Sequence, residues 1–268
     1  MEAPFRTALA DLLRIAQAQN RRLLLVGAFA RTLCLPESVR GPARKTRDAD
    51  VAVQMEDWSA FDDFLSACPP TFTVDRTELR LGHAQTGVKI DVVPCGAIER
   101  PPGSLPLRRT TRILNTTGLS EAFATARVED VGGLPLLVPR PEAFVLLKLL
   151  SFLDRRAPRD LRDTGYVLHR YPADEDAVWE DAMIMAGFAD ESLAWEDLGV
   201  WQLGRALTET FQPSTVAVFL AALERLTLEP DATRALLVQE DGIDRLEPDA
   251  RLLTADRIFD VLRRACRG

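Results

Sequence analysis

One stretch decides how this chain folds: Arg44-Lys45-Thr46-Arg47-Asp48-Ala49-Asp50-Val51-Ala52-Val53. Its second half is apolar and β-branched, which predicts a strand. Residues i and i+2 of a strand point to the same face, so Asp48 and Asp50 should project together. Two carboxylates held side by side repel each other unless a cation lies between them. Oxygen ligands of this kind suit Mg²⁺, so the pair indicates a metal site.

Two further segments belong with this pair. Leu23–Val26 has the pattern of a buried strand, which breaks at Gly27 and continues as a helix from about Ala28. A helix that begins just after a glycine is a natural phosphate-binding site. Downstream, Asp91 lies in the apolar strand pattern 88–93. A buried, unpaired carboxylate is costly, so Asp91 needs either a partner, for which we favour a metal, or an exposed strand face.

This order of strand, glycine turn, helix, Asp-x-Asp strand and later Asp strand resembles the nucleotidyltransferase superfamily related to polymerase beta. The run Arg44-x-Thr46-x-Asp48-x-Asp50 resembles its AbiEii-type, abortive-infection branch. One position departs from the pattern, because Ala28 stands where relatives carry a second glycine or a serine. The change removes a hydroxyl group but keeps the backbone N–H groups. The resemblance implies an α+β fold, with a mixed β-sheet domain followed by an all-helical C-terminal domain.

The resemblance also implies an enzyme that uses Mg²⁺, or Mn²⁺, to transfer a nucleoside monophosphate from an NTP to an acceptor hydroxyl. The implied catalytic residues are Asp48, Asp50, Asp91, Lys148 and Asp160, with the first three as metal ligands. The implied nucleotide-binding residues are Gly27, Ala28, Arg31, Arg44 and Thr46. The family's role is that of a toxin with an antitoxin partner, and RNA such as tRNA is a plausible acceptor. A protein or small-molecule acceptor, and a non-catalytic nucleotide- or partner-binding protein on the same fold, are the alternatives.

The later part of the chain carries the run Lys148-x6-Arg155-x3-Arg159-Asp160-x2-Asp163, which resembles the distal motif of the same family. Lys148 is the only charged residue between 144 and 150, so it should either reach out to solvent or meet an anion such as a nucleotide phosphate. Asp160 stands at an expected helix start, where it could instead only complement the helix dipole. Lys148→Ala is expected to impair turnover and leave the fold intact.

Charge is unevenly distributed along the chain. Residues 1–170 hold 24 Lys and Arg against 20 Asp and Glu, whereas residues 171–268 hold 9 against 20. One basic cluster follows the Asp91 strand and is either a solvated face or a surface for RNA; it consists of Arg100, Arg108, Arg109 and Arg112. The four cysteines form no Cys-x-x-Cys pair, so neither structural zinc nor a disulfide framework is expected. No apolar run is long enough to span a bilayer, and we expect a cytoplasmic protein.

The hydrophobic period changes from two to about 3.6 residues near Pro139, which predicts a domain boundary there. We therefore expect a catalytic domain over residues 1–138 and a helical domain over 139–268 that contributes Lys148 and Asp160 to the active site. The glycine pair at 132–133 predicts a hairpin. Helices are expected over 141–153, 160–170, 174–187, 201–211, 214–226 and 254–267. Trp179, Trp195 and Trp201 are expected to pack within them.

Overall fold

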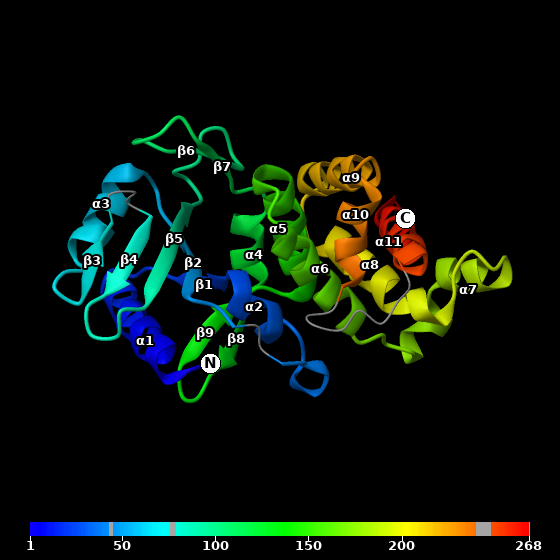
Figure 1. Cartoon of the computed structure of the whole chain (residues 1–268), viewed down its shortest axis with the longest axis horizontal. Coiled ribbons are helices and arrows are strands. Elements are labelled where there is room, and N and C mark those ends of the chain that lie inside the picture. Colours follow the sequence, from blue (N-terminus) through cyan, green and yellow to red (C-terminus); the bar gives the residue numbers. More distant parts are fainter. Residues whose placement is uncertain (43–44, 76–78, 240–247, 268) are drawn as a thin grey trace. The chain divides into compact units, whose positions relative to one another are not determined.

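The computed structural model of the chain describes residues 1–42, 45–75, 79–239 and 248–267. The chain divides into two compact units, which Figure 1 shows in ribbon form. The first comprises Met1–Cys34 and Gly41–Arg140, and the second comprises Leu35–Arg40 and Pro141–Gly268. The first unit mixes a sheet with helices and the second is helical, which confirms the predicted α+β fold class.

A seven-stranded mixed sheet forms the framework of the first unit, in the order β3-β4-β5-β2-β1-β9-β8. Its strands are β1 (Leu23–Val26), β2 (Asp48–Gln54), β3 (Phe72–Val74), β4 (Arg80–His83), β5 (Lys89–Cys95), β8 (Arg127–Asp130) and β9 (Pro135–Val138). Two neighbouring pairs, β2 with β5 and β1 with β9, run parallel, and the other pairs are antiparallel. A separate short ribbon is formed by β6 (Ser104–Pro106) and β7 (Ile113–Asn115).

Four helices accompany this sheet: α1 (Ala3–Ala18), α2 (Gly27–Leu33), α3 (Trp58–Ser66) and α4 (Leu119–Thr125). In α1 the buried residues recur at helical spacing, as Phe5, Leu9, Leu12 and Ala16 illustrate, so one face of the helix joins the core. α2 follows β1 without an intervening loop. The predicted strand, glycine turn and helix are therefore present, and they position the backbone of Gly27 beside the central strands.

The second unit is built from helices. They are α5 (Pro141–Arg155), α6 (Pro158–Arg170), α7 (Ala182–Ala189), α8 (Leu198–Thr210), α9 (Pro213–Thr227), α10 (Asp231–Arg234) and α11 (Pro248–Arg267), with short 3₁₀ turns at Glu37–Val39, Asp176–Glu180, Trp195–Asp197 and Ala235–Val238. A Cβ atom on Gly165 of α6 would lie 1.7 Å from the carbonyl oxygen of Leu237. The absence of a side chain there lets α6 pack directly against the backbone of the Ala235–Val238 turn. No described helix has both the length and the apolar character to cross a membrane.

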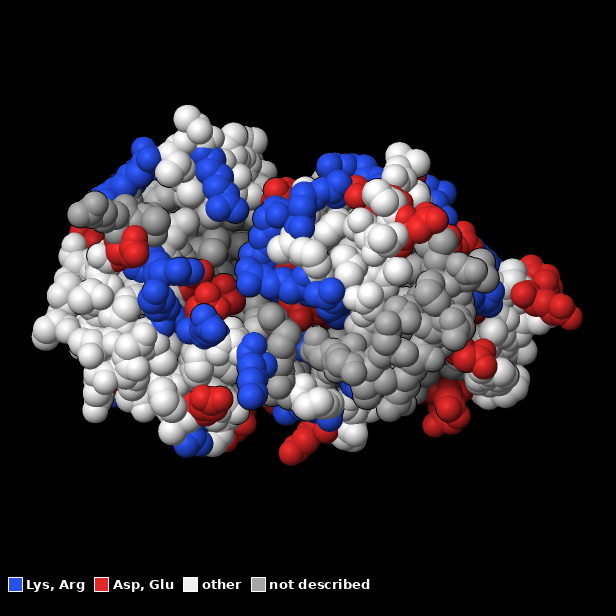
Figure 2. Space-filling model, in the orientation of Figure 1, with Lys and Arg blue, Asp and Glu red and all other residues white. Residues whose placement is uncertain are grey.

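The segment from 171 to 204 differs from its prediction. The expected helix 174–187 is divided into a 3₁₀ turn and α7 by Asp181, whose carboxylate accepts hydrogen bonds from the N–H groups of Met183 and Ile184. Trp201 is buried as expected, but the side chains of Trp179 and Trp195 are 68% and 55% exposed, so the prediction that they pack inside was wrong. The segment holds nine Asp and Glu and no Lys or Arg, and Figure 2 shows acidic side chains over the region that α7 occupies.

Candidate active site

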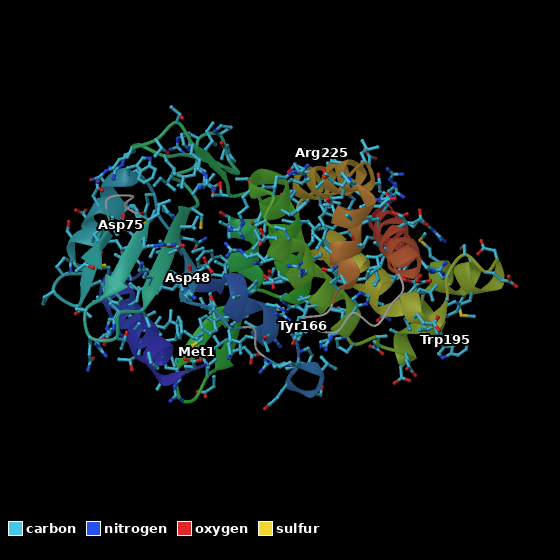
Figure 3. All side chains as sticks on the ribbon, in the orientation of Figure 1. Met1, Asp48, Asp75, Tyr166, Trp195 and Arg225 are labelled. Carbon is cyan, nitrogen blue, oxygen red and sulfur yellow. The ribbon has the colours of Figure 1, made fainter. Side chains whose placement is uncertain are left out.

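A row of charged side chains crosses the sheet of the first unit. Asp50 on β2 pairs with Asp91 on β5, and Asp91 pairs with Arg80 on β4. Residues directly opposite each other on neighbouring strands point to the same face, so these three side chains share one face of the sheet. Asp48 lies two residues before Asp50 on that face, at the start of β2, where Figure 3 labels it. The sheet thus brings together all three carboxylates that the sequence singled out.

Gly27 lies against this row from the other side. Val26 pairs with Asp50, and Gly27 follows it with a φ of +67°, a conformation that favours glycine. A Cβ atom on Gly27 would lie 2.0 Å from Asp50 Oδ2. Any other residue would therefore occupy the space beside that carboxylate oxygen. The absence of a side chain on Gly27 lets the Asp50 carboxylate lie directly against the backbone of the turn.

Arg80 is the cation of the row, and the sequence analysis did not identify it. Its Nε and Nη2 atoms donate to Asp91 Oδ1 and Oδ2 at 2.5 and 2.7 Å, a bidentate pair. Its Nη2 also lies 3.7 Å from Asp48 Oδ2. The hydrogen bonds and the charge of Asp91 raise the pKa of the Arg80 guanidinium above its usual value. The positive charge of Arg80 therefore reduces the repulsion between the carboxylates of Asp48 and Asp91, which the sequence analysis expected a metal ion to neutralise.

Lys89 is a second cation that the sequence analysis did not assign. It pairs with Asp48 across the parallel β2 and β5 strands and lies two residues before Asp91, so it belongs to the same face. It is exposed. The Lys-x-Asp spacing on one strand could have identified Lys89 from the sequence. Arg80 could not be found in that way, because its place depends on the pairing of β4 with β5.

The remaining residues predicted to bind a nucleotide have different environments. Thr46 Oγ1 lies 3.1 Å from Asp48 Oδ1 and 2.9 Å from the carbonyl oxygen of Asp48, so the hydroxyl is turned toward Asp48. Ala28 is buried in α2. Arg31 is 3% exposed, which does not favour direct contact with a nucleotide. Arg44 lies outside the described residues.

The donor set fits the metal that the fold family implies, with one restriction. Carboxylate oxygens are the ligands that Mg²⁺ prefers, and Asp48 and Asp50 point to the same face of β2. Asp91, however, is engaged by Arg80 through both of its oxygens. Within the described part of the chain, no three His, Cys, Asp or Glu side chains are grouped as ligands for one metal ion. The residues fit a metal held by Asp48 and Asp50, and Asp91 could join only if it separated from Arg80.

The distal motif forms a second charged cluster, inside the second unit. Lys148 Nζ on α5 donates to Asp160 Oδ1 at 3.1 Å and to Asp163 Oδ2 at 2.8 Å, both on α6. Arg155 also holds Asp160, from Nε at 2.7 Å and from Nη2 at 2.6 Å. Lys148 is only 6% exposed, so the alternative that it reaches out to solvent was wrong. Asp160 is more than a helix-dipole charge, because its carboxylate binds two cationic side chains.

The electrostatics of this cluster favour the charged form of Asp160. Burial by itself would raise the pKa of the carboxyl, but the hydrogen bonds from Arg155 and the charges of Lys148 and Arg155 hold it below its usual value. The cluster therefore joins α5 to α6 as a buried ion network. A role for Lys148 and Asp160 in catalysis stays a prediction.

The basic cluster after the Asp91 strand is partly engaged by the protein itself. Arg108 donates to both oxygens of Asp62, at 2.6 and 2.8 Å, and its guanidinium lies 4.5 Å from the ring centre of Trp58. Arg100 donates to the carbonyl oxygens of Ala97 and Glu99. These contacts would compete with phosphate binding, so the basic cluster is not a set of uncommitted charges.

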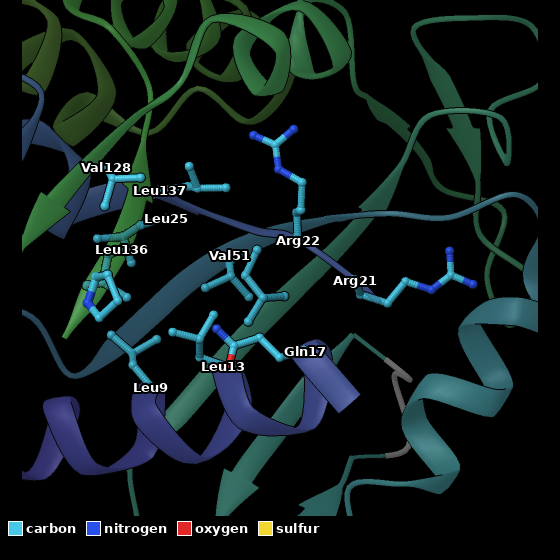
Figure 4. Close-up of a pocket in the computed structure, with 12 residues that line it drawn as sticks. Leu9, Leu13, Gln17, Arg21, Arg22, Leu25, Val51, Val128, Leu136 and Leu137 are labelled. Atoms are coloured by element: carbon cyan, nitrogen blue, oxygen red, sulfur yellow. The ribbon is translucent and has the colours of Figure 1, made fainter. Parts of the chain in front are cut away.

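A different kind of hollow lies between α1 and the sheet, and Figure 4 shows it in close-up. Its volume is about 290 Å³, and most of its lining is apolar, as with Leu9, Leu13 and Leu137. The side chains of Arg21 and Arg22 extend away from these leucines, toward Glu56 and the carbonyl oxygen of Phe123. The cavity therefore offers mainly apolar contact, and its lining residues include no carboxylate to hold a metal ion, so the carboxylate row is the better candidate.

Comparison with known proteins identifies a family. The sequence model of the family described as "Nucleotidyl transferase AbiEii toxin, Type IV TA system" matches residues 11–243. No curated protein sequence matches the chain.

Several solved structures are similar to the chain. An antigenic nucleotidyltransferase-like protein from Paracoccidioides brasiliensis is 17% identical, with a TM-score of 0.41, and the match covers 69% of this chain and 86% of that one. The solution structure of the antibiotic-resistance factor ANT(2'')-Ia is 13% identical, with a TM-score of 0.40, and covers 72% and 95%. The crystal structure of ANT(2'')-Ia with adenylyl-2''-tobramycin is 12% identical, with a TM-score of 0.38, and covers 70% and 98%.

Proposed function

The chain belongs to the AbiEii family of nucleotidyltransferase toxins, and we propose that it transfers nucleotides at the charged face formed by Asp48, Asp50 and Asp91. Nucleotidyl transfer is the activity class of the family. The observation that carries the choice of site is the close approach of Gly27 to Asp50, in the same row as Asp91. A carboxylate held against the backbone of a strand-to-helix turn would bring a bound metal and the N–H groups of the turn to the same phosphates.

In the proposed reaction an acceptor hydroxyl oxygen attacks the α-phosphorus of an NTP. A new oxygen–phosphorus bond forms, the bond from the α-phosphorus to its bridging oxygen breaks, and pyrophosphate leaves. Asp48 and Asp50 would hold Mg²⁺ or Mn²⁺, which when bound supplies charge neutralisation for the triphosphate. Asp91, the third proposed ligand, is the candidate to accept the hydroxyl proton. Backbone N–H groups after Gly27 would orient the phosphates.

The proposed part of Lys148 and Asp160 in transfer rests on the resemblance of their motif to the distal motif of the family. Their mutual ion pairs give both residues a structural role as well. A loss of activity in a variant at either position therefore counts as catalytic only if circular dichroism shows that the variant is folded under the assay conditions.

We propose RNA, such as the acceptor end of tRNA, as the acceptor, and a cognate antitoxin as the partner. The toxin–antitoxin character of the family supports the partner. The arginines between β5 and α4 support the acceptor, although Asp62 already engages Arg108. A protein or small-molecule acceptor is the alternative, and a salt-insensitive reaction would favour it.

The test is label transfer from each α-³²P-labelled NTP to total cellular RNA, with Mg²⁺ or with excess EDTA. Asp48→Asn and Asp50→Asn should each reduce transfer at least about 10³-fold, which corresponds to roughly 4 kcal/mol of barrier. Asp63→Asn, on the exposed side of α3, is the matched control and should retain activity. If both site variants retain activity within tenfold of the wild type, the proposed site is wrong. If the wild type binds NTP but transfers nothing to any acceptor, the non-catalytic alternative holds.

A further inference from the structure

Arg80 binds the carboxylate of Asp91, which is one of the three proposed metal ligands. It lies directly opposite Asp91 in the antiparallel β4–β5 pair and binds both oxygens of Asp91. The same guanidinium faces Asp48 at 3.7 Å. One internal cation thus touches two of the three proposed metal ligands.

We propose that Arg80 is a resident counter-cation of the active site, which neutralises Asp91 and Asp48 in the metal-free protein and competes with the divalent metal for them. This inference rests on the proposed function. Arg80 would act as a latch: while it holds both oxygens of Asp91, that carboxylate cannot bind the metal, and it becomes available when the guanidinium swings away. Arg80 is therefore a positioning residue that sets the metal affinity.

Two features of the row support competition in place of a permanent pair. The side chains of Arg80 and Asp91 are 36% and 30% exposed, so solvent reaches both partners. Water can therefore hydrate the guanidinium when it moves away from Asp91. The arrangement also places three carboxylates along one face of two strands, so a metal ion would be attracted to them as soon as Arg80 withdrew.

Deprotonation cannot release the latch. An arginine side chain stays charged in proteins, and the interaction with Asp91 raises the pKa of Arg80 further. A competing cation at the carboxylates, or a competing anion at the guanidinium, would separate the pair. A metal bound to the triphosphate of an incoming nucleotide supplies both at once. The latch would then make metal binding and nucleotide binding mutually favourable.

The test measures the binding of Mn²⁺ alone by isothermal titration calorimetry, in full-length wild-type protein, Arg80→Gln and Arg80→Lys. Arg80→Gln should bind Mn²⁺ about tenfold more tightly, the ratio expected if Arg80 leaves the wild-type site open in roughly one molecule in ten. Arg80→Lys keeps the charge but loses the bidentate geometry, so its affinity should rise at least about threefold. The metal-free Arg80→Gln protein should melt at a lower temperature than the wild type and recover when Mn²⁺ is added.

The matched control is Arg21→Gln. Arg21 donates to both oxygens of Glu56 at 2.7 Å in the same unit. Arg21 precedes β1 and Glu56 follows β2, so the pair lies at the ends of these strands away from Gly27 and Asp48. This variant also breaks an arginine–carboxylate pair, so it should lower the melting temperature, but it should leave Mn²⁺ affinity unchanged. If Arg80→Gln does not fold, ¹⁵N NMR of the wild type replaces it. Addition of Mg²⁺ should then move the Arg80 Nε signal, assigned by its absence in Arg80→Lys, and leave the Arg21 signal in place.

Several outcomes would overturn the inference. If Arg80→Gln binds Mn²⁺ within twofold of the wild type while wild-type transfer is normal, the latch is wrong and the proposed function stands. If Arg80→Lys binds like the wild type, charge alone is responsible and the latch is again wrong. An Arg80 signal that Mg²⁺ does not move has the same meaning. If neither protein binds Mn²⁺ and the wild type transfers no label, the proposed function has failed and takes the latch with it.

Discussion

Replacement of Lys148 by methionine should destabilise the protein, because burial changes what the sequence led us to expect of this residue. A surface lysine could be lost at little cost. Here the ammonium of Lys148 lies between Asp160 and Asp163, whose side chains are 0% and 1% exposed. Methionine fills a similar volume, so the change removes mainly the charge. It removes the cation that the two buried carboxylates share.

The magnitude follows from the partners that remain. Removal of one member of a buried ion pair costs about 3–5 kcal/mol. Arg155 still makes two hydrogen bonds to Asp160, so the loss should lie at the low end of this range, and we expect about 3 kcal/mol. Urea unfolding at pH 7, followed by circular dichroism, measures this loss.

A double variant tests the cause. Lys148→Met combined with Asp163→Asn removes a buried carboxylate charge together with the cation that binds it, so at least half of the lost stability should return. Asp163→Asn alone is the second single variant, and the complete double-mutant cycle should give a coupling energy of about 2 kcal/mol between Lys148 and Asp163. A loss below about 1 kcal/mol in Lys148→Met, or no recovery in the double variant, would refute the interpretation of this cluster as a buried ion network.

Three further predictions concern the turn, the pH dependence and the acceptor. Gly27→Ala places a side chain on a residue with a φ of +67° and against Asp50 Oδ2. The variant should lower the free energy of unfolding in urea by about 1–3 kcal/mol and abolish label transfer. An active Gly27→Ala variant would contradict the proposed site. The pKa of Asp160 is lower in the folded protein than in the unfolded chain. The stabilisation from this group is therefore complete above its unfolded pKa of about 3.9 and is lost as the pH falls through the lower folded value. Asp160→Asn should be less stable than the wild type at pH 7, and it should lose less stability than the wild type between pH 5 and pH 2. If RNA is the acceptor, the double variant Arg108→Gln with Arg109→Gln should flatten the log–log salt dependence of RNA binding by about 0.7 per lost phosphate contact. The total change should be nearer one unit than two, because Asp62 already holds Arg108. An unchanged slope would count against these arginines.

The acidic segment 171–204 shows where helical periodicity fails as a guide. The pattern predicted one helix over 174–187 and three packed tryptophans. The carboxylate of Asp181 instead caps a new helix and ends the preceding 3₁₀ turn. A capping residue inside an apolar pattern divides it, because the side chain satisfies N–H groups that a continuous helix would pair with backbone carbonyls. Two of the tryptophans then lie outside the packed helices.

The sequence by itself determined the local elements and the face on which Asp48 and Asp50 lie. Strand alternation and helical periodicity depend on neighbours a few residues apart, so the β1 strand, the turn at Gly27, the β8–β9 hairpin and most helices of the second unit could be predicted. The resemblance then named the family, which the match over residues 11–243 confirms.

Only the tertiary structure decided which charged groups meet. The alignment of Asp91 with Asp50 requires the parallel pairing of β2 and β5, and the place of Arg80 requires the register of β4 against β5. The burial of Lys148 likewise requires α6 to supply two carboxylates to α5. These contacts join residues far apart in sequence. They depend on how whole strands and helices pack, so no periodicity within a single segment encodes them.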